Sequence, residues 1–200
     1  MKKTKILAIA DIHGDVGLVK KLAKKAKDEN VDMVIVAGDL TFFGQSTKNL
    51  IGPFTKVNKP VLLIHGNHED LMDVNFLSEM YPNVRNIHGY AYSKGDVGIF
   101  GAGGTPSGRS SEKKVFETLE KGHNVVKDFK KRIMITHMHP EKTLAEFSGF
   151  PGSKGIRKAI EEFKPDLFIN AHIHEAEGLE EEIGKTKIIN IGRQGRILEI

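Results

Sequence analysis

The sequence contains no cysteine among its 200 residues. Disulfides, iron–sulfur clusters and thiolate zinc sites are therefore excluded, and so is catalysis by a cysteine nucleophile. Any bound metal must rely on histidine, carboxylate, amide or water ligands.

Long apolar runs are also absent from the sequence. No run approaches the roughly 20 residues that a membrane-spanning helix needs, so we expect no membrane partner. Residues 1–10 carry lysines followed by Ala8-Ile9-Ala10, which briefly resembles a signal peptide. The apolar stretch is shorter than the roughly 7–15 residues of a signal-peptide core, and Asp11 follows at once. We therefore predict that this segment is a first buried strand and that the protein is cytoplasmic.

The chain has little excess charge of either sign, with a formal net charge of +4. Lysines gather before residue 6 and between residues 20 and 27, but no aromatic residues are interleaved with them. A solvated helix face is therefore favoured over a nucleic-acid partner. A hydrophobic content of 39% in 200 residues suits one soluble domain, 1–200. Exposed apolar edges of such a domain could pair it into a homo-oligomer.

Apolar strand-like runs and helical stretches alternate along the first half of the chain. Such alternation predicts βαβ units with mostly parallel strand pairing. The expected strands are 5–10, 32–37 and 60–65. The expected helices are 16–28, a stretch near 46–57 interrupted by Gly52-Pro53, and 69–80.

The second half is predicted to be mixed. Residues 90–93 and 97–100 flank Lys94-Gly95-Asp96 and predict a hairpin, and residues 101–108 predict a flexible loop. Further strands are expected at 133–135, 167–169, 178–183, 185–191 and 196–200, with one helix capped by Ser110 or Ser111 and reaching about residue 129, and another at 154–163 capped by Ser153. The fold class is α/β: a four-layer α/β/β/α sandwich of two mixed β-sheets flanked by helices.

Metal-binding residue types follow five of the predicted strands. Carboxyl ends of neighbouring strands face one crevice, so ligands placed there can converge. The five blocks together predict a pair of metal ions, and mixed nitrogen and oxygen ligands suit manganese first, then iron, zinc, cobalt or nickel. The blocks are Asp11-Ile12-His13, Gly38-Asp39, Gly66-Asn67-His68-Glu69, Thr136-His137-Met138-His139-Pro140 and Ala171-His172-Ile173-His174.

The order D-x-H, G-D, G-N-H-[DE], a strand-end histidine and H-x-H resembles the calcineurin-like metallophosphoesterase superfamily, especially its small, minimal members. The resemblance spans residues 11–174. It implies that His68 lies near the substrate without binding metal, and that Asp39 bridges both ions together with a water or hydroxide. It further implies that one ion is held by Asp11, His13, Asp39 and His174, and the other by Asp39, Asn67, His137 and His172.

A charge count supports an anionic substrate. Two divalent ions bring four positive charges, and two carboxylates and a hydroxide remove three, so one remains to attract a small phosphate ester. A third carboxylate in place of Asn67 would cancel it. We therefore predict a phosphoesterase that cleaves a mono- or diester by in-line attack of a metal-bridging hydroxide, with Asp39 and His68 as catalytic residues. His68 would stabilise the transition state or protonate the leaving oxygen.

Two other functions fit the same motifs. A non-catalytic metal-binding scaffold of the same fold is one, although a scaffold has no need of His68. A nuclease is the other, although residues 175–200 leave little chain for an added DNA-contacting region.

Two positions depart from the family pattern or are ambiguous within it. The family usually has glycine where this chain has Ala171, and a positive φ there would strain alanine and weaken the second ion site. His137 follows its strand directly, so we favour it over His139 as a ligand, and we expect His139 to line the pocket.

Arginines and the remaining histidines have weaker signals. Arg109 and Arg193 lie in loops that could grip phosphate bidentately, although surface exposure explains them equally well. No function is expected for His65, which we predict to be packed, for His88 in a turn, or for His123 on a solvated helix face.

Overall fold

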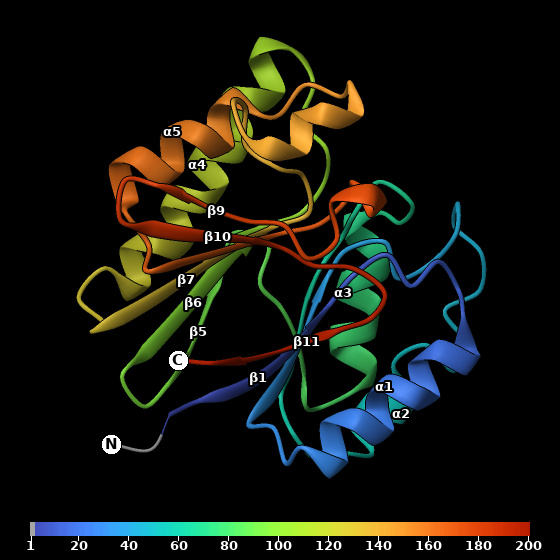
Figure 1. The fold of residues 1–200 in the computed structure, drawn as a ribbon. Helices are drawn as coiled ribbons and strands as arrows, with labels where there is room; N and C mark the ends of the chain where they lie inside the picture. The colour runs from blue at the N-terminus through green and yellow to red at the C-terminus, as the bar shows by residue number, and fades with distance from the viewer. Residues whose placement is uncertain (1–2) are drawn as a thin grey trace.

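Two β-sheets face each other in the computed structural model, which describes residues 3–200, and helices cover the outer face of each sheet (Figure 1). The predicted four-layer arrangement of two mixed sheets flanked by helices is therefore confirmed. Within the described residues, no helix combines the length and apolar character needed to cross a bilayer.

The first sheet contains the first four strands of the described chain and the last one. Strands β1 to β4 run parallel, and β11 pairs antiparallel with β1. Parallel strands end at the same edge, so residues that follow β1, β2 and β3 come together there. The strands, in spatial order, are β11 (Arg196–Glu199), β1 (Lys5–Ile9), β2 (Met33–Ala37), β3 (Val61–Ile64) and β4 (Val84–Asn86).

The second sheet has a parallel centre and antiparallel edges. Strands β6, β7, β8 and β10 are parallel, while β5 and β9 pair antiparallel at the two sides. Its spatial order is β5 (Ala91–Lys94), β6 (Val97–Ala102), β7 (Lys131–Thr136), β8 (Leu167–Asn170), β10 (Thr186–Asn190) and β9 (Glu180–Ile183).

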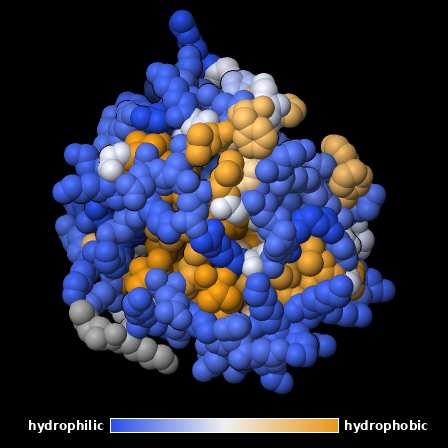
Figure 2. Space-filling view, in the orientation of Figure 1, coloured by the Kyte–Doolittle hydropathy of each residue, from blue (hydrophilic) through white to orange (hydrophobic). Residues whose placement is uncertain are grey.

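Strand β1 shows how the alternation of side chains builds the layers. Ile6 and Ala8 lie in the core between the two sheets, whereas Leu7 and Ile9 lie in the core beneath the helices. Successive side chains of a strand point to opposite faces, so a strand covered on both sides reads as a continuous apolar run. In Figure 2 hydrophobic side chains are visible between the layers, within a largely hydrophilic surface.

Within residues 3–200, five α-helices cover the outer faces of the sheets. α1 (Val16–Asp28), α2 (Gly52–Thr55) and α3 (Leu71–Met80) lie on the first sheet, and α4 (Gly108–Val126) and α5 (Lys154–Phe163) lie on the second (Figure 1). Ser153 caps α5 as predicted, because its side chain accepts a hydrogen bond from the Ile156 N–H.

Three local predictions are wrong. The helix near 46–57 is only the four-residue α2, which begins at Gly52-Pro53, and Leu50 and Ile51 are buried ahead of it without a helix. Residues 101–108 are not all loop, since β6 extends through Ala102 and α4 begins at Gly108. Ser107 is therefore the N-cap residue in place of Ser110 or Ser111, and α4 ends at Val126.

Candidate metal centre

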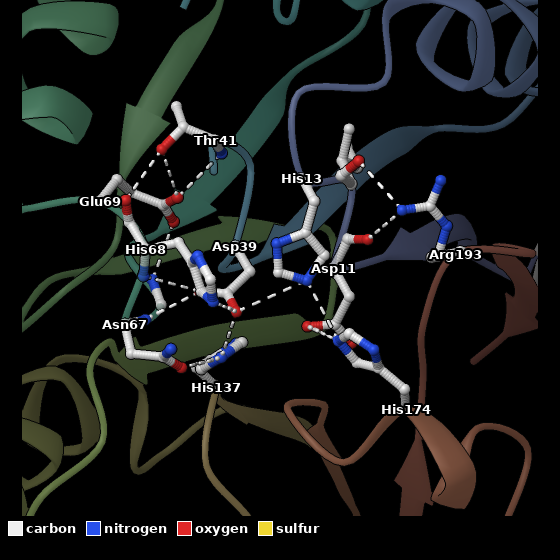
Figure 3. A network of polar contacts seen from close by, with 12 residues as sticks. Asp11, His13, Asp39, Thr41, Asn67, His68, Glu69, His137, His174 and Arg193 are labelled. Atoms are coloured by element: carbon white, nitrogen blue, oxygen red, sulfur yellow. Dashed lines mark hydrogen bonds and ion pairs between the residues drawn. The ribbon is translucent and has the colours of Figure 1, made fainter. Parts of the chain in front are cut away.

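The five sequence blocks meet at one edge of the two facing sheets. The blocks that follow β1, β2 and β3 come from the first sheet, and those that follow β7 and β8 come from the second (Figure 3). The site therefore lies at the carboxyl ends of these strands and spans the interface between the two sheets. All seven predicted ligands and His68 lie in this region.

Asp39 is the centre of the arrangement. Its Oδ1 atom accepts hydrogen bonds from the backbone N–H groups of Asn67, at 2.8 Å, and His68, at 3.1 Å. Its Oδ2 atom lies 3.3 Å from His137 Nε2, 3.7 Å from His68 Nε2 and 3.9 Å from His13 Nε2. One oxygen thus fixes the β3 loop, and the other faces three imidazoles.

The pKa of Asp39 is held below its ordinary value. Burial acts to raise this pKa, but the His137 imidazole beside Oδ2 and the backbone N–H of His68 favour the ionised form and prevail. Asp39 is only 2% exposed, so the carboxylate is a buried negative charge that requires positive neighbours.

Asp11, His13 and His174 form one side of the centre. Asp11 is 1% exposed, and neither of its carboxylate oxygens has a hydrogen-bond partner among the described residues. Its Oδ1 lies 3.9 Å from His174 Nε2, which is 3.1 Å from His13 Nε2. Burial raises the pKa of Asp11 to about 6. An unpartnered buried carboxylate is costly, so a cation between these three side chains fits the donor set.

Asn67, His137 and His172 form the other side, with Asp39 shared between the two. Ligand atoms of Asp39, His137 and His172 lie within 4.8 Å of one another. His137 Nε2 is 3.1 Å from Asn67 Oδ1, while His137 Nδ1 is 2.8 Å from the Ala37 carbonyl. The Nδ1 atom donates to that carbonyl, so Nε2 offers a lone pair toward the site, as metal-binding histidines typically do. Burial lowers the pKa of His172 to about 4, which keeps its imidazole neutral and able to bind a cation.

His139 occupies a different place from His137. It is fully buried, and its Nε2 atom is 3.3 Å from the Phe150 carbonyl. It therefore holds the backbone of the loop between β7 and α5 through this nitrogen, and it is not among the described residues whose ligand atoms gather at the centre. Between the two histidines, the geometry favours His137 as the ligand.

His68 faces the centre with one nitrogen and the backbone with the other. Its Nδ1 atom accepts a hydrogen bond from the Phe43 N–H at 3.3 Å, so in the neutral ring the proton is on Nε2. That Nε2–H points toward Asp39, with Phe42 stacked on the imidazole at 5.2 Å between ring centroids. His68 can thus present a proton to a group bound over the centre.

Four of the site residues have left-handed backbone conformations. The φ angles are 53° at Asp11, 48° at His13, 52° at Asp39 and 73° at His172. Such conformations cost energy in non-glycine residues and are concentrated at functional sites. Ala171 does not have a positive φ, so the strain that we expected at this alanine lies at the following residue.

Replacing Ala171 by glycine is expected to destabilise the protein and to leave metal binding unimproved. The Ala171 side chain is fully buried in the core between the sheets, and its backbone does not need glycine. The loss of a buried methyl group and the gain in chain entropy together should lower the free energy of unfolding by about 1–2 kcal/mol. Chemical denaturation and metal titration would measure both effects. A tighter second metal site in Ala171→Gly would contradict this reading.

The two arginines differ in position. Arg193 lies beside the end of β1, where it donates to the backbone carbonyls of Asp11 and Ile12 at 3.2 and 3.3 Å and pairs with Asp15 at 2.8 Å. It therefore holds the loop that follows β1 through these contacts. Arg109 is exposed in the first turn of α4 and lines a pocket that also contains His172.

The other histidines are packed outside the centre. His65 and His88 lie with ring centroids 4.7 Å apart, and His88 Nδ1 accepts from the Gly103 N–H. His123 stacks on Phe163 at 4.4 Å between centroids, so it is less solvated than we predicted.

Glu69 has a structural role that the sequence analysis left unassigned. This buried carboxylate accepts hydrogen bonds from the backbone N–H groups of Gly66, at 2.8 Å, and Thr41, at 3.0 Å. It therefore ties the loop after β3 to the loop after β2, which carry Asn67 and Asp39. The only feature of the sequence that could have indicated this role is that an acidic residue directly follows Asn67-His68.

Comparison with known proteins gives concordant results. The sequence profile of the calcineurin-like phosphoesterases matches residues 4–176. An uncharacterized protein of Methanocaldococcus jannaschii is 30% identical over 199 residues, which cover 95% of this chain and 88% of that protein.

Similar solved structures show the same fold. A Thermus thermophilus protein superposes with a TM-score of 0.79 at 18% identity, over 100% of this chain and 99% of the other. A dimetal phosphatase from Danio rerio gives 0.67 at 11% identity, over 96% and 88%. An archaeal phosphodiesterase gives 0.57 at 18% identity, over 98% and 99%.

Proposed function

Because this chain belongs to the calcineurin-like phosphoesterase family, we propose that it is a metal-dependent hydrolase of small phosphate mono- or diesters. The observation that carries the proposal is the position of Asp39, a buried carboxylate between two sets of nitrogen and oxygen ligands. A single carboxylate shared in this way suits a pair of cations.

We assign the ligands according to the two sides of the centre. Asp11, His13 and His174 would hold one divalent ion, Asn67, His137 and His172 would hold the other, and Asp39 would be a ligand to both. Nitrogen and oxygen ligands without thiolate suit manganese, iron, zinc, cobalt or nickel, and we propose manganese first. When bound, such ions would supply Lewis-acid activation of the phosphoryl group and of a water nucleophile.

The protein side chains supply orientation and a proton. The hydrogen bonds from the Asn67 and His68 backbones fix Asp39, and Glu69 fixes the loops that carry these residues. His68 holds its proton on Nε2, facing the centre, and donates it to the leaving oxygen as the phosphorus–oxygen bond breaks. Asn67 is neutral, so the centre retains a net positive charge for an anionic ester.

A metal and ester panel tests the proposal. We expect the purified protein with added manganese to release nitrophenol from p-nitrophenyl phosphate or bis(p-nitrophenyl) phosphate, and metal analysis to give about two ions per chain. Activity should disappear on chelation and return when manganese is restored. If the protein binds two ions but hydrolyses neither ester with manganese, iron, zinc, nickel or cobalt, the hydrolase proposal is wrong and the protein is a metal-binding scaffold.

A further inference from the structure

A pocket of about 550 Å³ opens beside the proposed ligand His172. Its apolar wall is formed by Met138, Phe150 and Pro151, and its charged residues are on α4 and α5. In Figure 2 hydrophobic side chains gather at the surface over the segment that joins β7 to α5, which forms this wall. The pocket is large enough for an organic group attached to a phosphate over the centre.

Phe150 is exposed, and hydrogen bonds hold its backbone. Its side chain is 61% exposed, and its ring lies edge-on to His172 with centroids 6.4 Å apart. The Phe150 carbonyl faces His139 Nε2 at 3.3 Å, and the Phe150 N–H donates to Ser148 Oγ at 3.3 Å. An aromatic ring exposed next to a candidate ligand provides a surface on which a flat ring can stack.

The pocket also carries uncompensated positive charge. No hydrogen bond or ion pair joins the side chain of Arg109 or Lys154 to another residue in the described part of the chain. Among the described residues, Glu112 is the one carboxylate lining the pocket, and its Oε2 accepts 2.6 Å hydrogen bonds from Ser153 Oγ and the Gly155 N–H. Two cations against one carboxylate leave a net charge of +1, which favours an occupant with its own negative charge.

His68 lies on the other side of the centre. A ring nitrogen of His68 lies within 4.8 Å of a ring nitrogen of His13 and a carboxylate oxygen of Asp39, whereas a ring nitrogen of His172 lies within 4.8 Å of ligand atoms of His137 and Asp39. Beside His68 lie the rings of Phe42 and Phe43, with centroids 5.2 and 4.2 Å from the imidazole. If His68 protonates the leaving oxygen, the leaving group must lie on the His68 side of the centre. The pocket beside His172 can then hold the other group esterified to the same phosphate.

We propose that this pocket binds the retained group of a phosphodiester, and that this group contains a flat ring and a further negative charge, as a nucleoside phosphate does. The assignment of leaving and retained sides rests on the proposed function. In the reaction a water oxygen bonds to phosphorus, the bond to the leaving oxygen breaks, and the His68 Nε2 proton passes to that oxygen. The proton that the water gives up is taken up in turn by His68, which regains its neutral form. The retained group stays on the phosphate in the pocket, whereas a monoester would leave the pocket unused.

Three diesters with one leaving group test the proposal. Methyl p-nitrophenyl phosphate, thymidine 5′-(p-nitrophenyl phosphate) and its 3′-phosphorylated form all release nitrophenol and differ only in the retained group. We expect kcat/KM to rise by about fivefold or more from methyl to thymidine through ring stacking. The 3′-phosphate should add about threefold.

Matched variants assign each gain to a residue. Phe150→Ala should remove the gain from thymidine, and Arg109→Ala should remove the gain from the 3′-phosphate, each gain being the ratio of kcat/KM to that of the methyl ester in the same variant. Phe147→Ala is the control for the first, since Phe147 is 62% exposed in the same loop but does not line the pocket. Lys113→Ala on α4 is the control for the second. Equal kcat/KM for the three diesters, or a better rate with p-nitrophenyl phosphate, would overturn the proposal.

Binding separates this inference from the hydrolase proposal. Thymidine 3′,5′-bisphosphate should bind the manganese-loaded protein in calorimetry, about fivefold more weakly to Phe150→Ala and about threefold more weakly to Arg109→Ala. This result supports the pocket even if no ester is hydrolysed, in which case only the proposed function fails. Affinity unchanged in both variants would overturn the pocket whether or not the protein is a hydrolase.

Discussion

Asp39→Asn is expected to lose nearly all phosphoesterase activity while the protein stays folded. The asparagine oxygen can still accept the backbone hydrogen bonds of Asn67 and His68, so the loop after β3 keeps its anchor. Its amide nitrogen, however, would replace Oδ2, the atom that faces His13, His68 and His137. An amide N–H cannot bind a cation, and the bridging negative charge is lost.

The size of the effect follows from the role of the bridge. Metal catalysis supplies several kcal/mol of charge stabilisation, so kcat should fall by about 10³-fold or more. Metal analysis should show at least one ion lost per chain, with thermal unfolding still cooperative. Asp166→Asn is the matched control, because Asp166 directly precedes β8 and so lies at the end of the second sheet away from the centre. Full metal content and activity in Asp39→Asn would refute the shared-ligand assignment.

His68→Ala is expected to lower turnover without removing metal. If Nε2–H protonates the leaving oxygen, its loss should lower kcat by about 10²–10⁴-fold for an alkyl ester, whose leaving oxygen needs the proton. The loss should be smaller for a nitrophenyl ester, because nitrophenolate departs readily without protonation. The comparison of the two esters distinguishes proton donation from a purely structural role.

A control and a contrary outcome complete this test. His123→Ala removes an imidazole that stacks on Phe163, outside the centre, and should retain activity toward both esters. Metal content should match the parent in both variants. An equal loss for the two esters, or a loss of bound metal in His68→Ala, would show that His68 acts as a ligand or a support and does not donate the proton.

The sequence was sufficient for the layers and for the convergence of the site because both depend on strand ends. Buried parallel strands such as β2 read as continuous apolar runs, and their polar successors must meet at one edge. Weaker local signals failed. The three-residue β4 is too short to show a periodic pattern. The apolar residues Leu50 and Ile51 suggested the buried face of a helix, whereas they are buried by packing against residues distant in the sequence.

Side-chain partners across the chain could not be read from the sequence. Arg193 pairs with Asp15, 178 residues earlier, and only the position of β11 beside β1 brings them together. The same holds for Phe150, whose proximity to His172 arises from the loop between β7 and α5. His139, which we expected to line the pocket, is fully buried with its Nε2 atom 3.3 Å from the Phe150 carbonyl, a contact that no sequence motif indicates.

The left-handed conformations of Asp11, His13, Asp39 and His172 place the candidate ligands at the centre but lower the conformational stability of the protein. Glycine would adopt these φ angles without strain, and an apolar residue would avoid burying the carboxylate of Asp11. Sequence optimisation for thermal tolerance alone would therefore replace the very residues that gather at the centre. Variants of this fold that have lost the reaction should accumulate such replacements first, so an engineer seeking a sturdier inert framework would begin at these four positions.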